Sequence, residues 1–138
     1  MTFRKLSPWL SRLFILAVAG LFTVVGLRFI LDPLHTAAES GFTLDSAVGY
    51  TNVRAGVGGF PLGFAMILTF SLFSSRRLWG ALASIATIDG VLLVIRLYGA
   101  AHDHTFSQSA RILIPEVVVL VFSLVGVRVE TRRRALAR

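Results

Sequence analysis

Residues 78–99 read LWGALASIATIDGVLLVIRLYG, and this stretch decides the fold. At about 1.5 Å rise per residue, a helix over it is roughly 33 Å long, slightly more than the hydrocarbon core of a bilayer. The stretch therefore predicts a membrane-spanning helix. It carries two charges, Asp89 near its middle and Arg96 near its end, which fall on one helical face. A carboxylate facing lipid is costly, so we expect this face to look into protein.

The composition of the whole chain points to the same class of protein. Of the 138 residues, 55% are hydrophobic, and the mean hydropathy is +0.77. This is too apolar for a soluble domain, so we expect one all-α domain over residues 1–138 in contact with a lipid bilayer. The net charge of +7 does not indicate nucleic acid as a partner, because the basic residues flank apolar spans. The absence of cysteine excludes disulfides and thiolate sites.

Three further apolar stretches predict spans over residues 10–31, 48–73 and 109–127. The first follows basic residues, as a secretory signal does, but it ends at Asp32-Pro33 and not at a small-residue cleavage site. We therefore expect this span to be retained in the protein. The remaining segments are predicted to be polar outer loops at 34–47 and 100–108, a short turn at 74–77, and a basic tail at 128–138.

The second span is rich in small residues. Ala55, Gly59 and Gly63 recur every four residues, a spacing that lets a neighbouring helix approach closely. Pro61 removes a backbone donor and is expected to bend the helix. A packing seam with a kink is the favoured interpretation.

Basic residues are distributed unequally between the two ends of the predicted bundle. Neither outer loop contains Lys or Arg, and most of the basic side chains lie at the other end: Arg4, Lys5, Arg12, Arg76, Arg77, Arg128, Arg132, Arg133, Arg134 and Arg138. The positive-inside rule therefore places both termini and residues 74–77 in the cytoplasm. Short connections predict an up-down-up-down four-helix bundle.

Ionisable and polar residues inside the spans gather in the outer half of this bundle. Several sit too deep to reach the headgroups, so they need mutual pairing or water. We expect a charged cavity there, with Asp89 and Glu116 as the candidate acid–base pair. The candidate ligand-binding residues are Arg28, Asn52, Arg54 and Arg96. Ion pairs of this kind can also serve only to fix helix packing.

The chain resembles a family of small, uncharacterised bacterial four-helix integral membrane proteins, a domain-of-unknown-function family. The resemblance covers most of the chain and rests on short motifs in a common order: Gly26-Leu27-Arg28-Phe29, Asn52-Val53-Arg54 with glycines after it, Asp89-Gly90 followed by Arg96, and Pro115-Glu116. It implies a four-helix membrane fold in the bacterial inner (plasma) membrane and no established activity. DoxX-like and anthrone-oxygenase-like proteins are looser analogies.

Three function classes follow from these residues. The first is a protein that binds a small anionic or lipophilic ligand in the charged cavity. The second is an accessory or structural subunit that docks a membrane protein partner or a second copy of itself through the glycine seam. The third is a membrane enzyme of isomerase or oxidoreductase type, with the carboxylates as acid and base and the arginines holding developing negative charge.

The histidines do not indicate a metal. His102-Asp103-His104 and His35 lie in the predicted loops, where solvated histidines are more common than ligands, so we expect no metal site. A cofactor cannot be assigned from the sequence.

Overall fold

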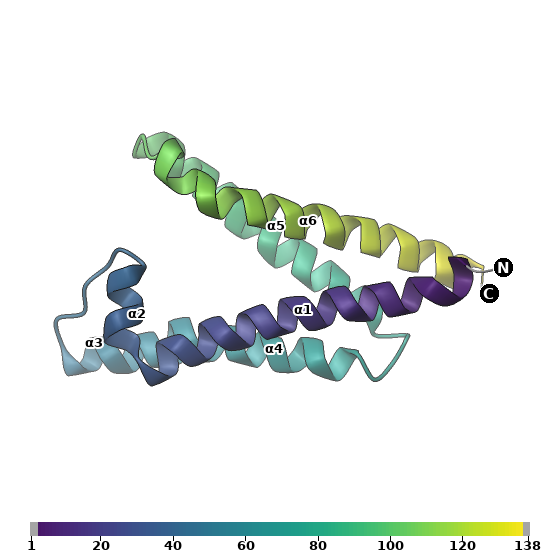
Figure 1. Cartoon of the computed structure of the whole chain (residues 1–138), viewed down its shortest axis with the longest axis horizontal. Coiled ribbons are helices and arrows are strands. Elements are labelled where there is room, and N and C mark those ends of the chain that lie inside the picture. Colours follow the sequence, from purple (N-terminus) through teal and green to yellow (C-terminus); the bar gives the residue numbers. More distant parts are fainter. Residues whose placement is uncertain (1–2, 137–138) are drawn as a thin grey trace. The chain divides into compact units, whose positions relative to one another are not determined.

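The computed structural model describes residues 3–136, except for the side chains of residues 3–7 and 108. Its described part is helical throughout, with loops and turns but no strand. Figure 1 shows the elements in chain order: α1 (Phe3–Leu31), α2 (Pro33–Glu39), α3 (Ala47–Asn52), η1 (Val53–Gly59), α4 (Phe60–Ser71), α5 (Leu78–His102) and α6 (Phe106–Ala135).

Within residues 3–136, four helical stretches are long and apolar enough to cross a membrane, which confirms the predicted number of spans. They cover Pro8–Leu31, Ala47–Ser71, Leu78–His102 and Ser109–Ala135. The first three agree closely with the predicted ranges. The fourth continues beyond Val127, because α6 runs on through most of the segment expected to be a tail. Arg138 and the side chains of Arg4 and Lys5 lie outside the described residues.

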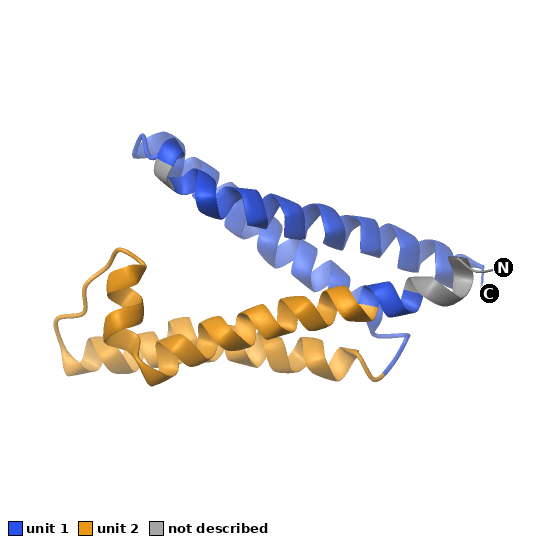
Figure 2. Ribbon diagram, in the orientation of Figure 1, with its two compact units in different colours: residues 1–11, 74–138 blue, residues 12–73 orange. Residues whose placement is uncertain are grey.

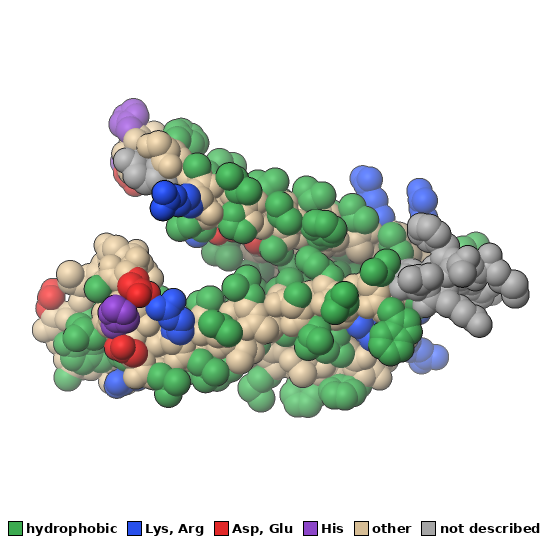
Figure 3. Space-filling model, viewed as in Figure 1, with side chains coloured by type: hydrophobic (Ala, Val, Ile, Leu, Met, Phe, Trp, Pro, Cys, Tyr) green, Lys and Arg blue, Asp and Glu red, His purple; other side chains and the backbone are tan. Residues whose placement is uncertain are grey.

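Apolar side chains cover the outside of the helices. In Figure 3 hydrophobic groups spread over the long helices of the visible face. Only 6% of the most apolar window of the fourth span is buried inside the chain. A helix of a soluble protein buries its apolar stripe, whereas here most of that surface is left for lipid or protein partners. The structure thus supports a multi-pass membrane protein.

Two compact units make up the chain, coloured separately in Figure 2. Unit 1 comprises residues 1–11 and 74–138, and unit 2 comprises residues 12–73.

In unit 2, α1 runs antiparallel to the second span. The two are joined near one end by Arg12, whose Nε donates to the carbonyl of Leu72 at 3.1 Å. Near the other end a close approach occurs at Gly26, where an added Cβ would lie 2.8 Å from the carbonyl oxygen of Gly58. An edge-to-face contact of Phe22 with another ring, 5.2 Å between centroids, lies between these points. The helices therefore touch along their length.

The predicted glycine seam is not the surface that packs within the chain. Nothing lies within 4 Å of a Cβ built on Gly63, and one built on Gly59 meets only the carbonyl of Arg54. Gly58, one position away from the predicted row, packs against Gly26 and Ile30 instead. The contact with α1 is therefore carried by Gly58, and the predicted row of Ala55, Gly59 and Gly63 stays a prediction for a partner helix.

The second span is not a uniform α-helix. Residues Val53–Gly59 form the π-helical segment η1, and α4 begins at Phe60 with Pro61 in its first turn. A proline costs least in a first turn, where its missing N–H has no helical partner to lose. The wider π-helical turn lies immediately before Pro61, and the bend expected at Pro61 stays a prediction. Such π segments occur often at functional positions.

The segment predicted as an outer loop begins with a helix. Asp32 accepts a hydrogen bond from the backbone N–H of His35 at 3.3 Å, and Pro33 occupies the first turn of α2. An Asp cap followed by Pro is a helix-start signal, so the same two residues end α1 and begin α2. Gly41, with φ of 86°, then turns the chain back toward α3.

In unit 1, α5 and α6 are antiparallel neighbours. Trp79 Nε1 donates to Thr131 Oγ1 at 3.0 Å near the start of α5. Further along, an added Cβ on Gly126 would lie 2.9 Å from the fully buried side chain of Leu82. Arg96 reaches Glu116 nearer the other end of the pair. These contacts fix which faces of the two helices meet, and they put Arg96 and Glu116 between the helices.

Candidate functional site

Arg96 and Glu116 form an ion pair between α5 and α6. The Nε of Arg96 lies 2.9 Å from each carboxylate oxygen of Glu116, and Nη2 lies 2.8 Å from Oε1. The Arg96 side chain is 35% exposed and that of Glu116 is 15% exposed, so the pair is partly shielded. A guanidinium that contacts a carboxylate through two nitrogens is a strong, orienting interaction. The geometry joins two of the residues expected in one charged site.

Asp89 lies two turns before Arg96 on α5, about 10 Å along the helix axis. Its Oδ2 is buried and has no hydrogen-bond partner among the described residues. Seven residues separate Asp89 from Arg96, so the two side chains lie on one face of α5. Buried polar atoms are nearly always satisfied, so an orphaned carboxylate oxygen within an apolar span needs an explanation.

The residue after Asp89, Gly90, faces α6. A Cβ built on Gly90 would meet Leu120 of α6 at 3.7 Å, an ordinary van der Waals contact. Nearer the start of α5, the two helices meet through apolar contacts such as that of Leu82 with Gly126. With the three charged groups ionised, Asp89, Arg96 and Glu116 carry one net negative charge. We call these three residues the α5–α6 charged centre.

Within this centre the two predicted acid–base residues are not equivalent. Both oxygens of Glu116 already accept from Arg96. Asp89 has an oxygen free to accept a hydrogen bond or to exchange a proton with a bound molecule. Any acid–base chemistry at this place would therefore depend on Asp89, with Glu116 acting through its hold on Arg96.

Arg28 belongs to a different group, in unit 2. Its guanidinium forms an ion pair with Glu39 of α2, and His35 lies 3.0 Å from the other oxygen of the same carboxylate. These side chains are about half exposed or more. Sequence reasoning missed Glu39 as a partner because it assigned that residue to a loop. The helix-start signal at Asp32-Pro33 could have revealed that Glu39 lies on a helix.

The other two candidate ligand-binding residues of unit 2 also face local partners or solvent. Arg54, in η1, donates from Nε to the carbonyl oxygen of Ile30 at 3.1 Å. Asn52 is exposed at the end of α3. Thus Arg28, Asn52 and Arg54 lie in unit 2 and the charged centre lies in unit 1. The expected convergence of both groups on one cavity stays a prediction.

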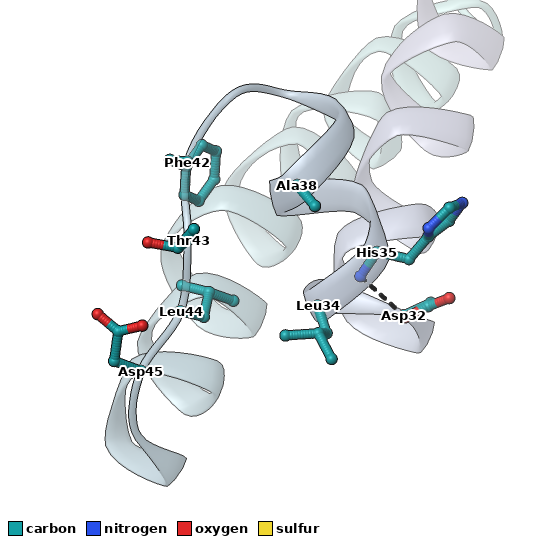
Figure 4. Close-up of a pocket in the computed structure, with 8 residues that line it drawn as sticks. All are labelled: Asp32, Leu34, His35, Ala38, Phe42, Thr43, Leu44 and Asp45. Atoms are coloured by element: carbon teal, nitrogen blue, oxygen red, sulfur yellow. Dashed lines mark hydrogen bonds between the residues drawn. The ribbon is translucent and has the colours of Figure 1, made fainter.

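Two open cavities of unit 2 lie beside α2. The larger, about 470 Å³, is bounded by α2 and residues 42–45 and is drawn in Figure 4. In that view the side chains of Leu34 and Leu44 face the space between the two segments, while the carboxylate of Asp45 points away from it. A second cavity of about 340 Å³ includes Arg28 in its lining. Neither includes a residue of the charged centre.

A second polar cluster, which the sequence did not indicate, lies near the end of α6. Glu130 is fully buried, accepts from Ser11 Oγ at 3.0 Å and pairs with Arg133 at 2.6 Å. Arg133 also donates to the carbonyl oxygen of Ser75 at 2.8 Å. The predicted fourth span ended at Val127, so Glu130 was assigned to the basic tail and its burial was not predicted. Because arginines flank Glu130 on both sides in the sequence, this segment was interpreted as a solvated basic tail.

Among the described residues, no group of three or more His, Asp or Glu side chains is placed to hold a metal ion. His102 pairs with Asp103 at 2.8 Å, and both are exposed.

Comparison with known proteins adds no relative: no protein-family model, curated protein or solved structure matches this chain.

Proposed function

We propose that this chain is a multi-pass protein of the bacterial inner membrane that binds a small lipophilic ligand at the α5–α6 charged centre. The observation that carries the proposal is the buried, unpartnered Oδ2 of Asp89 beside the Arg96–Glu116 pair. Ionisable residues inside a span are costly to keep there, which makes them functional candidates by default. A bound molecule that donates a hydrogen bond to Oδ2 would offset the cost of burying it.

The charge balance of the centre favours one class of ligand. Arg96 is engaged by Glu116, and an ionised Asp89 would add a further negative charge, so an anion would meet net repulsion when Asp89 is ionised. A neutral or cationic molecule with a hydroxyl or amino group and an apolar body fits better. The apolar body would lie against the lipid-facing side chains of α5 and α6, and its donor would reach Asp89.

Copurification tests this proposal. The protein is purified in mild detergent as wild type, Asp89→Asn and Asp103→Asn, and solvent extracts are compared by mass spectrometry. Asp103 is a matched control because it is an exposed acid just beyond the same helix. We expect one small molecule near stoichiometry in the wild type and in Asp103→Asn, and about tenfold less in Asp89→Asn, since a hydrogen bond to a charged group is lost. Equal amounts in all three proteins, or none in the wild type, would contradict the proposal.

A second candidate is an accessory subunit or homo-oligomer. It is favoured by the small residues of the second span, where Ala55 and Gly63 are exposed and no atom lies within 4 Å of a Cβ on Gly63. Small residues at four-residue spacing allow close packing of a partner helix in lipid. Replacing Gly63 by Leu should then dissociate the complex in mild detergent while the isolated chain stays folded. If the mass of the detergent-solubilised complex, measured by light scattering, is unchanged in Gly63→Leu, the helix face with Ala55 and Gly63 does not bind a partner.

A further inference from the structure

The end of unit 1 where α5 begins and α6 finishes holds an arginine cluster of fixed geometry. Arg133 Nη2 donates to the carbonyl of Ser75 at 2.8 Å, and Arg134 donates to the carbonyl of Arg76. The last turns of α6 are therefore tied to the turn before α5. We call residues 75–79 and 128–134 the arginine end.

An aromatic side chain stands inside this end. Trp79 donates from Nε1 to Thr131 Oγ1 at 3.0 Å, and the guanidinium carbon of Arg134 lies 5.3 Å from the centroid of the Trp79 ring. Indole rings held by a hydrogen bond at one edge are typical of the boundary between the hydrocarbon and headgroup layers. Trp79 thus marks the depth of the arginine end relative to a bilayer.

The side chains of four arginines of this end have no partner in the described part of the chain. They are exposed, and none has an ion pair or side-chain hydrogen bond: Arg76, Arg77, Arg128 and Arg132. The one acid of the arginine end, Glu130, is fully buried and already paired. The surface therefore carries unbalanced positive charge.

We propose that the arginine end binds the headgroups of anionic phospholipids. Apolar spans lead directly into it, and Trp79 places it at the level of headgroup phosphates. Guanidinium groups suit phosphate oxygens because they donate from a planar fork. The opposite end of unit 1 differs, since its exposed Arg111 is accompanied by the exposed acid Asp103. An acidic protein and free phosphate are the competing occupants that the test below distinguishes.

The test measures the apparent dissociation constant for dioleoylphosphatidylglycerol, by native mass spectrometry of the full chain released from detergent. The variants are Arg77→Gln/Arg132→Gln, the charge-retaining Arg77→Lys/Arg132→Lys, and the control Arg111→Gln. We expect the Gln pair to bind about 30-fold more weakly at low salt, because two cationic contacts are lost. The Lys pair and Arg111→Gln should stay within about threefold of the wild type.

Dioleoylphosphatidylcholine and inorganic phosphate serve as comparison probes on the same protein. Weak binding of both probes supports the lipid assignment. Weaker phosphatidylglycerol binding in about 0.5 M salt, where the Debye length is below about 5 Å, supports it as well. Equal affinity for the two lipids would overturn it. An apparent dissociation constant of the Gln pair equal to that of the wild type would also overturn it. The same holds if inorganic phosphate displaces the lipid at a similar concentration, or if an acidic protein remains bound to the arginines and blocks lipid binding.

Discussion

Arg96 of α5 and Glu116 of α6 meet through three contacts, with Nε 2.9 Å from both carboxylate oxygens and Nη2 2.8 Å from one of them. The pair links two neighbouring spans and leaves Asp89 as the carboxylate with a free, buried oxygen. One contact thus both fixes a helix register and defines the polar part of the candidate site.

Breaking this pair on one side should destabilise the protein. Arg96→Met leaves Glu116 uncompensated inside a span, and we expect a loss of about 2 kcal/mol in the free energy of unfolding. The double variant Arg96→Met/Glu116→Leu should recover most of that loss, because no charge is stranded. The measurement is unfolding in mixed micelles of sodium dodecyl sulfate. Losses that simply add in the double variant would show that the pair contributes no coupling.

The close approach in unit 2 gives a prediction with an internal control. Gly26→Ala places a methyl 2.8 Å from the carbonyl oxygen of Gly58, so we expect destabilisation of about 1–3 kcal/mol. Gly20→Ala lies in the same helix with nothing within 4 Å, and it should be neutral or stabilising by up to about 1 kcal/mol. The same unfolding measurement compares the two. Similar effects at both positions would mean that α1 and η1 do not pack at Gly26.

Glu130 should be among the most sensitive side chains at the end of α6. Glu130→Ala leaves Ser11 Oγ without its acceptor and removes the ion-pair partner of Arg133, and we expect a loss of about 3 kcal/mol. Thr131→Ala, at the next position, removes the bond from Trp79 and the bond that Thr131 Oγ1 donates to the carbonyl oxygen of Val127, both exposed, and should cost about 1 kcal/mol. Thermal unfolding in detergent checks the order. A smaller loss of stability in Glu130→Ala than in Thr131→Ala would argue against a buried cluster of Ser11, Glu130 and Arg133.

Orientation in the membrane can be measured cleanly because the chain contains no cysteine. The basic residues predict that Ser74→Cys reacts with a membrane-impermeant maleimide only after cells are permeabilised. Thr43→Cys, in the exposed segment before α3, should react in intact cells. Labelling of Ser74→Cys from outside would reverse the proposed topology.

The spans could be predicted from the sequence because each depends on a local property, a run of apolar residues long enough to cross a bilayer. The polar partners could not be predicted in the same way. We expected one site to contain Arg96, Asp89 and Glu116. The sequence does not indicate that Arg96 pairs with Glu116 and that Asp89 stays unpaired. That choice depends on the register of α5 against α6, which is set by contacts such as Leu82 on Gly126.

Two local features were predicted only in part. Asp32-Pro33 ends the first span as predicted, but the same residues also begin α2 and so give Arg28 its partner Glu39. The π segment before Pro61 depends on where backbone hydrogen bonds shift from the fourth to the fifth residue, which composition does not specify.

The most direct test of the central proposal is an experimental structure of the protein in lipid nanodiscs, at a resolution that shows the side chain of Asp89. We predict density for a non-protein group within about 3 Å of Asp89 Oδ2, with the Arg96–Glu116 pair in place. An Oδ2 that instead bonds to a side chain of this chain, such as Arg54, with no non-protein density beside it, would contradict the ligand site.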